Sequence, residues 1–272
     1  MFMPAHMERA LFSEVFMAAS SHATHHDLVA SQFGAVSQAY VTSAVHANGA
    51  DLDQLEDLVR GKGQAQVLDM GCGGGHVSFR VAPWVAQVTA YDLSESMLDA
   101  VQKEAARQGR GNIIRRQGPV ESLPFADGSF DVVASRFSAH HWHDVDAGLR
   151  EARRVLKRGG VAAFADVVTP DAPLLDTWLQ TLELIRDPSH GRNFSVAQWQ
   201  ETLARAGFTV TGVTTRRLRL EFSSWVKRIA TPDVHVQALR SLHTRMPQEA
   251  VDYFELETDG SFTIDTMVMT AA

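Results

Sequence analysis

The feature that most constrains the fold is an alternation of short apolar runs with helical segments in the middle of the chain. Five apolar runs occur at residues 65–70, 86–92, 112–117, 130–135 and 160–168. Helical spacing of apolar residues lies between them, at about 76–82, 94–107 and 144–156, the last ending before Gly159-Gly160. Strands that are apolar along their whole length and are joined by helices form parallel sheets covered on both faces. The sequence therefore predicts a doubly wound, Rossmann-like α/β sheet.

Helical patterns flank this region on both sides. Residues 25–47 and 51–60 carry helical spacing, so we predict an N-terminal helical cap over residues 1–60 and an α/β domain over 61–272. Within that domain we expect helical insertions at about 173–206 and 222–254, separated by a strand at 208–220. Asp259-Gly260 precedes an alternating apolar run, which predicts a closing hairpin strand.

Composition excludes several classes of protein. With 45% apolar and 21% charged residues, the chain can bury an ordinary core. A net charge of −7 argues against a nucleic-acid partner, and we interpret Arg216, Arg217 and Arg219 as a solvated strand face. The single cysteine rules out an internal disulfide and favours a cytoplasmic location. No apolar stretch approaches membrane-spanning length, so we expect no stable membrane insertion.

A glycine-rich turn follows the first apolar run. The segment VLDMGCGGGHVS places Gly71, Gly73 and Gly75 between a strand and a helix, where glycine lets the backbone approach a ligand. The spacing departs from the dinucleotide fingerprint, because His76 follows G-x-G-x-G. A phosphate-binding P-loop would need Gly-Lys-Ser/Thr, which is absent.

Two carboxylates accompany this turn. Asp69 lies two residues before Gly71, a position unsuited to a pyrophosphate but suited to a cationic ligand. Asp92 ends the next strand, where an acidic side chain binds ribose hydroxyls. Asp92 could alternatively cap the following helix, a role that Ser94 can also fill. Two carboxylates, three glycines and no phosphate partner point to a positively charged adenosine ligand, and S-adenosylmethionine fits.

Four ordered segments carry a family resemblance. VLDMGCGGGHVS, TAYDLSESML, VESLPFADGSFDVVAS and LREARRVLKRGG resemble successive motifs of class I S-adenosylmethionine-dependent methyltransferases. Over roughly residues 35–170 the chain is most similar to the group that includes the ubiquinone/menaquinone C-methyltransferases (methyltransferase type 11). The resemblance implies a seven-stranded sheet whose last strand is antiparallel, in agreement with the closing strand.

The resemblance also implies a set of cofactor-binding residues. It assigns the methionine part of the cofactor to Asp69, Gly71, Cys72, Gly73 and Gly75. It places Asp92 on the ribose, Leu93 and Met97 against the adenine, and Val120, Glu121 and Arg136 at the same site. Pro119 stands where the family usually has Asp or Asn as acceptor for the adenine amino group. Because the backbone N–H of Val120 remains, we expect weakened adenine recognition, and this departure leaves room for a non-catalytic binding protein.

The segment SRFSAHHWHD follows the fourth strand, at the edge of the sheet where ligands bind. His140 and His141 are our candidate catalytic residues, because histidine exchanges protons near neutral pH. Packing against Trp142 is the structural alternative for either ring. His143 is expected at the surface and Asp144 at a helix N-cap. The three histidines lack i, i+4 spacing, so we assign no metal ligands.

A second cluster lies in the segment ELIRDPSHGRNFS, between two helices. We predict that Arg186, His190 and Arg192 bind the acceptor together with Arg136, since arginines suit an acidic or phenolate group. An internal Arg–Asp salt bridge that caps the helix is the structural alternative. In the family an N-terminal helix closes over the cofactor, so we add Tyr40 to the acceptor site, although a plain buried aromatic is equally consistent.

The resulting hypothesis is methyl transfer from S-adenosylmethionine to a small-molecule acceptor. The acceptor is a carbon or oxygen nucleophile that receives the sulfonium methyl group by in-line displacement. Positioning can supply roughly 7–11 kcal/mol of the barrier, and a base adds about 10²–10⁴ in rate. The alternatives are a non-catalytic S-adenosylmethionine-binding protein and a metal-dependent hydrolase built on the histidines.

Overall fold

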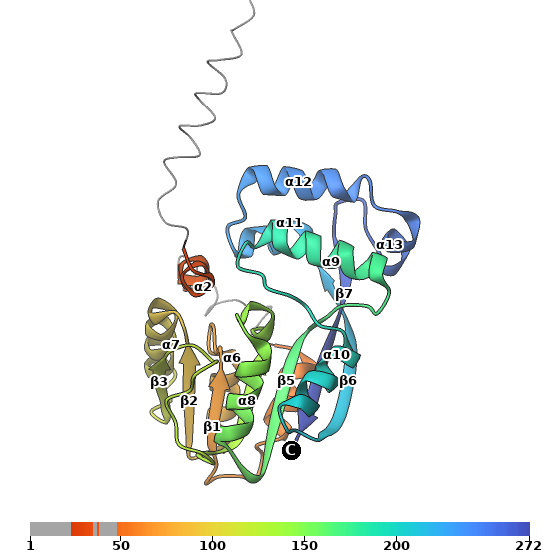
Figure 1. Cartoon of the computed structure of the whole chain (residues 1–272). Coiled ribbons are helices and arrows are strands. Elements are labelled where there is room, and N and C mark those ends of the chain that lie inside the picture. Colours follow the sequence, from red (N-terminus) through yellow and green to blue (C-terminus); the bar gives the residue numbers. More distant parts are fainter. Residues whose placement is uncertain (1–22, 35–36, 38–47) are drawn as a thin grey trace, which may run out of the picture.

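Within the residues that the computed structural model describes, 23–34, 37 and 48–272, seven strands form one sheet (Figure 1). The strand order is β3-β2-β1-β4-β5-β7-β6. The strands are β1 (Gln66–Met70), β2 (Gln87–Asp92), β3 (Ile113–Gln117), β4 (Phe130–Arg136), β5 (Leu156–Val168), β6 (Val210–Leu220) and β7 (Phe262–Ala271). Strands β1 to β5 pair in parallel, whereas β7 is antiparallel to both β5 and β6. The predicted fold class is confirmed.

Helices cover both faces of the sheet and its upper edge. They are α2 (His25–Gly34), α5 (Ala50–Asp57), α6 (His76–Val81), α7 (Glu95–Arg107), α8 (Val145–Val155), α9 (Pro173–Arg186), α10 (Val196–Arg205), α11 (Phe222–Arg228), α12 (Asp233–His243) and α13 (Gln248–Tyr253). Two short 3₁₀ turns, η1 (Ala82–Trp84) and η2 (Ala139–His141), complete the described elements. None of the helices that the structure describes is long and apolar enough to cross a membrane.

The apolar run of β1 is buried from both sides. Val67 belongs to a core cluster with Leu52 and Leu98, whereas Leu68 and its neighbours on the other face pack with Leu149 and Trp199. Successive side chains of a strand point to opposite faces, so a sheet with helices on both faces needs apolar residues at nearly every position. This is why the five runs in the sequence predicted parallel strands.

A third core cluster builds a helical lobe at the carboxyl ends of the parallel strands. Leu179 of α9, Trp225 of α11, Leu239 of α12 and Phe254 after α13 pack together with Phe262 of β7. In Figure 1 these helices lie above the strands, and α2 lies above α7, against which it packs. The lobe and α2 therefore face the sheet edge at which ligands bind in open α/β folds.

Three boundaries differ from the sequence-based expectation. Strand β5 begins at Leu156 rather than at Gly160, directly after α8 ends at Val155, because Leu156 is buried and already pairs with Phe130. Strand β7 does pair with β6, but α11, α12 and α13 join the two strands instead of a tight hairpin. The predicted helix at 25–47 is described as α2 up to Gly34, and most of residues 35–47 lie outside the described part.

Candidate active site

A cavity of about 370 Å³ lies between the carboxyl ends of the parallel strands and the helical lobe. The carboxyl ends of β1, β2 and β4 and the turns after them supply one side of its lining, including Asp69, Asp92 and Arg136. Helices α2, α9 and α11, the start of α5 and strands β5, β6 and β7 supply other parts. The cavity thus joins both clusters that the sequence singled out.

The glycine turn exposes its backbone to this cavity. Gly71 adopts φ +64°, and a Cβ atom on it would lie 1.8 Å from the Ser138 Oγ atom, so only glycine fits there. Gly75 adopts φ +76° as the residue before α6 and, unlike Gly71, Cys72 and Gly73, does not line the cavity. The turn is therefore shaped to let a ligand approach the main chain.

Asp69 places a buried carboxylate beside the glycine turn. Its Oδ2 atom accepts hydrogen bonds from the backbone N–H and the hydroxyl of Ser78, at 3.0 and 2.7 Å. Its Oδ1 atom has no hydrogen-bond partner among the described residues, although it is buried. Burial raises the pKa of Asp69 to about 7. An unsatisfied acceptor at the wall of a cavity fits a cationic ligand.

Asp92 joins the glycine turn to the next helix. It accepts hydrogen bonds from the backbone N–H groups of Gly73 (2.8 Å) and Ser94 (2.9 Å), while the Ser94 hydroxyl caps α7. Burial raises the pKa of Asp92. The side chains of Leu93, Met97, Val120 and Glu121 line the adjoining part of the cavity. These donors, acceptors and apolar contacts fit the adenosine of S-adenosylmethionine.

Pro119 lies beside this region but does not line the cavity. Its carbonyl accepts a hydrogen bond from the hydroxyl of Tyr91 at 3.1 Å. Glu121 lines the cavity and accepts hydrogen bonds from the backbone N–H groups of His143 and Asp144. These two hydrogen bonds hold His143 and Asp144, at the end of the histidine segment, next to the part of the cavity that fits adenosine.

The histidine segment leaves β4 through a strained turn. Phe137 adopts φ +49°, a conformation rare for a bulky residue, and its N–H donates to the carbonyl of Ala165. The turn brings His140 to Asp166 on β5, whose Oδ1 atom lies 2.5 Å from Nδ1 of His140. Burial lowers the pKa of His140, but the Asp166 charge and hydrogen bond outweigh it, and the net shift is upward.

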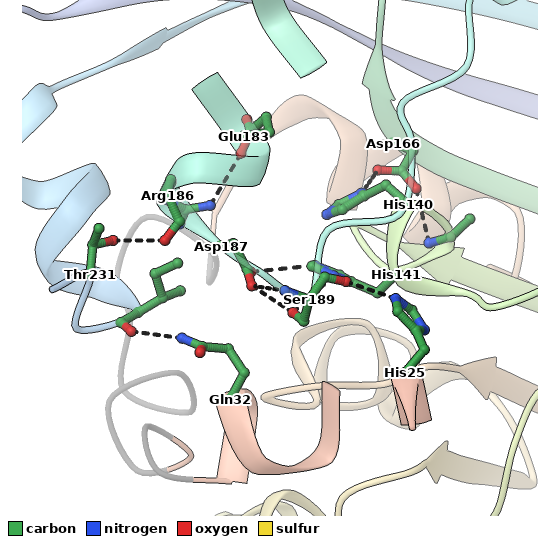
Figure 2. Close-up of polar contacts among 12 residues, drawn as sticks. His25, Gln32, His140, His141, Asp166, Glu183, Arg186, Asp187, Ser189 and Thr231 are labelled. Atoms are coloured by element: carbon green, nitrogen blue, oxygen red, sulfur yellow. Dashed lines mark hydrogen bonds and ion pairs between the residues drawn. The ribbon is translucent and has the colours of Figure 1, made fainter. Parts of the chain in front are cut away.

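His141 is held in a different way (Figure 2). Its Nδ1–H donates to the carbonyl of Ser189 at 3.1 Å, so Nε2 is the proton-accepting atom. That Nε2 atom lies 4.0 Å from Oδ2 of Asp187, a buried oxygen with no hydrogen-bond partner among the described residues. Burial, together with the nearby charge of His140, lowers the pKa of His141 to about 4.

The loop after α9 docks on the histidine segment. The backbone N–H of Gly191 donates to the carbonyl of His140 at 2.7 Å. Arg186 lines the cavity, but its ion pair is with Glu183 rather than with Asp187, and its guanidinium stacks on Trp225. Arg186 therefore does not form the internal Arg–Asp salt bridge that was the structural alternative for this cluster.

The other predicted acceptor residues have different positions. His190 is buried behind His140, where it contacts Gln180, and burial lowers its pKa to about 2. Arg192 pairs with Asp176 at 2.8 Å. Neither residue lines the cavity, because the loop turns both side chains toward α9. Tyr40 lies outside the described residues.

Helix α2 forms another part of the cavity wall. His25 contacts the Ser189 carbonyl at 3.2 Å, Gln32 donates to the carbonyl of Ile229, and Phe33 packs edge-on against His141. His26 lies 3.4 Å from Glu121. In Figure 2 His25 and Gln32 rise from α2 toward the loop and the lobe. His25 and His26 thus contact Ser189 and Glu121, and the residues around them in the sequence did not indicate these contacts.

Sequence reasoning missed the buried carboxylate Asp166. The signal was an acidic residue inside the apolar run GVAAFADVV, where only a paired carboxylate is tolerated. It also grouped Arg216 with exposed residues, whereas Arg216 is half-buried and lines the cavity with Leu218 and Leu220. Among the described residues, no group of three or more His, Cys, Asp or Glu side chains is arranged to hold a metal ion.

Comparisons with known proteins agree with this geometry. Residues 68–164 match a family described as a methyltransferase domain. The uncharacterized protein YafE of Escherichia coli (strain K12) is 47% identical over 74% of this chain and 97% of its own length. The uncharacterized methyltransferase YcgJ of Bacillus subtilis (strain 168) is 32% identical over 82% of this chain and 88% of its own.

A solved structure and a more distant relative complete the comparison. The crystal structure of YcgJ superposes with a TM-score of 0.78 at 30% identity, covering 81% of this chain and 97% of that one. The ubiquinone/menaquinone biosynthesis C-methyltransferase UbiE of Rhizobium johnstonii is 36% identical over 41% of this chain and 45% of its own length. The chain belongs to the S-adenosylmethionine-dependent methyltransferases with this methyltransferase domain.

Proposed function

We propose that the protein transfers the methyl group of S-adenosylmethionine to a carbon or oxygen nucleophile of a small molecule. One observation carries the proposal: Asp69, Asp92, His140 and His141 line the same cavity. A donor bound at the carboxylates and an acceptor bound at the histidines would therefore lie next to each other in this cavity. A cytoplasmic location belongs to the same proposal.

The protein binds the donor through the carboxylates of Asp69 and Asp92 and through the backbone of the glycine turn. When bound, S-adenosylmethionine would supply a methyl group on a sulfonium; the acceptor nucleophile would bond to the methyl carbon as the carbon–sulfur bond breaks, with S-adenosylhomocysteine as the leaving group. The free Oδ1 atom of Asp69 faces the positive charge of the donor, and Asp92 orders the Gly73 backbone and accepts from the ribose. Leu93 and Met97 enclose the adenine, and Arg136, paired with Asp51, completes the wall.

His141 serves as the base for the acceptor. At neutral pH its ring is neutral because burial lowers its pKa to about 4, so Nε2 has a free lone pair. When Nε2 takes a proton from the acceptor, the carboxylate of Asp187 at 4.0 Å stabilises the imidazolium. The low pKa limits His141 as a base, and the Asp187 charge offsets part of that limit.

His140 has a complementary role. Asp166 raises the pKa of His140 and so favours its protonated form, and the ring lies at the cavity wall next to His141, with ring centroids 4.2 Å apart. A positive wall stabilises the negative charge that develops on an enolisable carbon or a phenol when it loses a proton. Such acceptors are the ones for which a base matters most.

The proposal is tested with isotope-labelled S-adenosylmethionine and a cell metabolite extract. Label is expected in a small molecule, which mass spectrometry then identifies. Binding of the donor without a labelled product would favour the non-catalytic alternative raised by Pro119. Loss of product formation on adding a chelator would favour the metal-dependent alternative. A matched reaction with heat-denatured protein excludes transfer by other components of the extract.

A further inference from the structure

The cavity extends well beyond the donor-binding residues, to an apolar wall at the far edge of the sheet. Val167, Leu218, Leu220, Trp225 and Ile264 line this part, and all but Leu218 are buried. They come from β5, β6, α11 and β7. Apolar walls of this kind favour the hydrocarbon or aromatic body of a ligand.

One arginine in this part differs from its neighbours in its partners. Arg217 pairs with Asp265, Arg219 with Glu257, and Arg186 with Glu183. The half-buried Arg216 forms no ion pair with any residue that the structure describes. Its Nη2 atom donates to the neutral Oε1 atom of Gln54 at 3.0 Å. A guanidinium has five donors, so Gln54 leaves most of this group available.

The surroundings of Arg216 make an anion the favoured occupant. A charge beside apolar walls is poorly solvated, and a partner of opposite charge relieves that penalty. The planar guanidinium matches the two oxygens of a carboxylate. Gln54, which is itself bonded to Thr214 and Arg216, holds the guanidinium in place.

The strand register separates this arginine from the His140–Asp166 pair beside the proposed base. Val167 of β5 pairs with Thr266 of β7, and Thr266 pairs with Arg216 of β6. Neighbouring strands lie about 4.8 Å apart, so the backbone of Arg216 lies roughly 10 Å from that of Val167. Asp166, which binds His140, directly precedes Val167. A ligand that reaches both regions must be elongated.

We propose that the acceptor is an elongated amphipathic anion. Its carboxylate or similar oxyanion binds Arg216, its apolar body packs against Leu218, Leu220 and Trp225, and its other end presents the nucleophile to His141. The anionic group is thus an anchor and not the methylated atom. This inference rests on the proposed function, because it assigns the far part of the cavity to the acceptor.

The test is calorimetric and uses the full chain saturated with S-adenosylhomocysteine. The probes are octanoate and naphthalene-2-carboxylate, each compared with its neutral amide. Both carboxylates are expected to bind about tenfold or more tightly than their amides, as for one charge-assisted hydrogen-bonded pair. Arg216→Gln should remove this preference, and Arg216→Lys should keep part of it because the charge remains. Arg219→Gln, on the exposed face of the same strand, is the matched control.

Three outcomes would overturn the inference. The first is equal affinity of carboxylates and amides, or no saturable binding of either carboxylate. The second is a carboxylate preference that survives Arg216→Gln. The third is a loss of S-adenosylhomocysteine affinity in Arg216→Gln, which would place the donor's own carboxylate on Arg216. Failure of the proposed function has a separate signature, since no labelled metabolite would then form in the extract.

Discussion

The Nδ1 atom of His140 lies 2.5 Å from Oδ1 of Asp166, which makes a buried imidazole and a buried carboxylate one unit. Asp166 also accepts hydrogen bonds from the backbone N–H groups of Ala139 and Val167, so its position is set by the main chain of η2 and β5. The carboxylate therefore determines both the orientation of the ring and its protonation.

Removal of the Asp166 charge should reverse the shift of the His140 pKa. In the wild type the pKa lies above its ordinary value because Asp166 outweighs burial. In Asp166→Asn burial becomes the dominant influence on the His140 ring, so the pKa of His140 should fall below about 6.5. Nuclear magnetic resonance of the imidazole nitrogens across a pH series measures it. Asp127→Asn, at an exposed carboxylate, should leave the His140 titration unchanged.

Donor affinity should depend on pH through Asp69. The pKa of this carboxyl is raised to about 7, so below pH 7 it becomes neutral and loses its attraction for a cation. Affinity for S-adenosylmethionine should be highest above pH 7 and about tenfold weaker at pH 6 than at pH 8. Calorimetry at the two pH values measures this difference. Asp69→Asn should bind weakly with a flat profile, and an unchanged slope in that variant would remove Asp69 from the donor site.

Asp92→Ala should abolish tight binding of S-adenosylmethionine. The change removes the proposed acceptor for the ribose and the hydrogen bond that orders the N–H of Gly73. Hydrogen bonds to charged groups contribute about 1.5–3 kcal/mol, so affinity should fall at least about tenfold. Calorimetry on the folded variant is the measurement. Asp99→Ala, at an exposed residue of α7, is the control, and equal affinities would contradict the ribose assignment.

His141→Ala should lower turnover much more than donor affinity. Loss of a general base typically reduces the rate by about 10²–10⁴. Turnover of the labelled product and calorimetry with S-adenosylmethionine separate the two effects. His143→Ala is the matched control, because its imidazole lies on the exposed side of the same segment. If His140→Ala and His141→Ala are both fully active, the two rings have a structural role.

Much of the donor side was already predictable from local sequence. Short apolar runs require a covered parallel sheet, and the turn after β1 places Gly71 at φ +64°, a backbone conformation that favours glycine. The carboxylates Asp69 and Asp92 occur at strand ends next to that turn, and their spacing alone places them together. These features depend on neighbours within about 20 residues, so the pattern contains them.

The acceptor side depended on the tertiary structure. His141 and Asp187 are far apart in sequence and meet because the loop after α9 folds back onto η2. His140 meets Asp166 because the turn after β4 lies against the neighbouring strand β5. The same packing turned His190 and Arg192 away from the cavity and brought Arg216 into it from the edge strand. The pattern of residues along the sequence determines which of them lie in the same helix or strand. The long-range packing of the lobe determines which side chains line the same cavity.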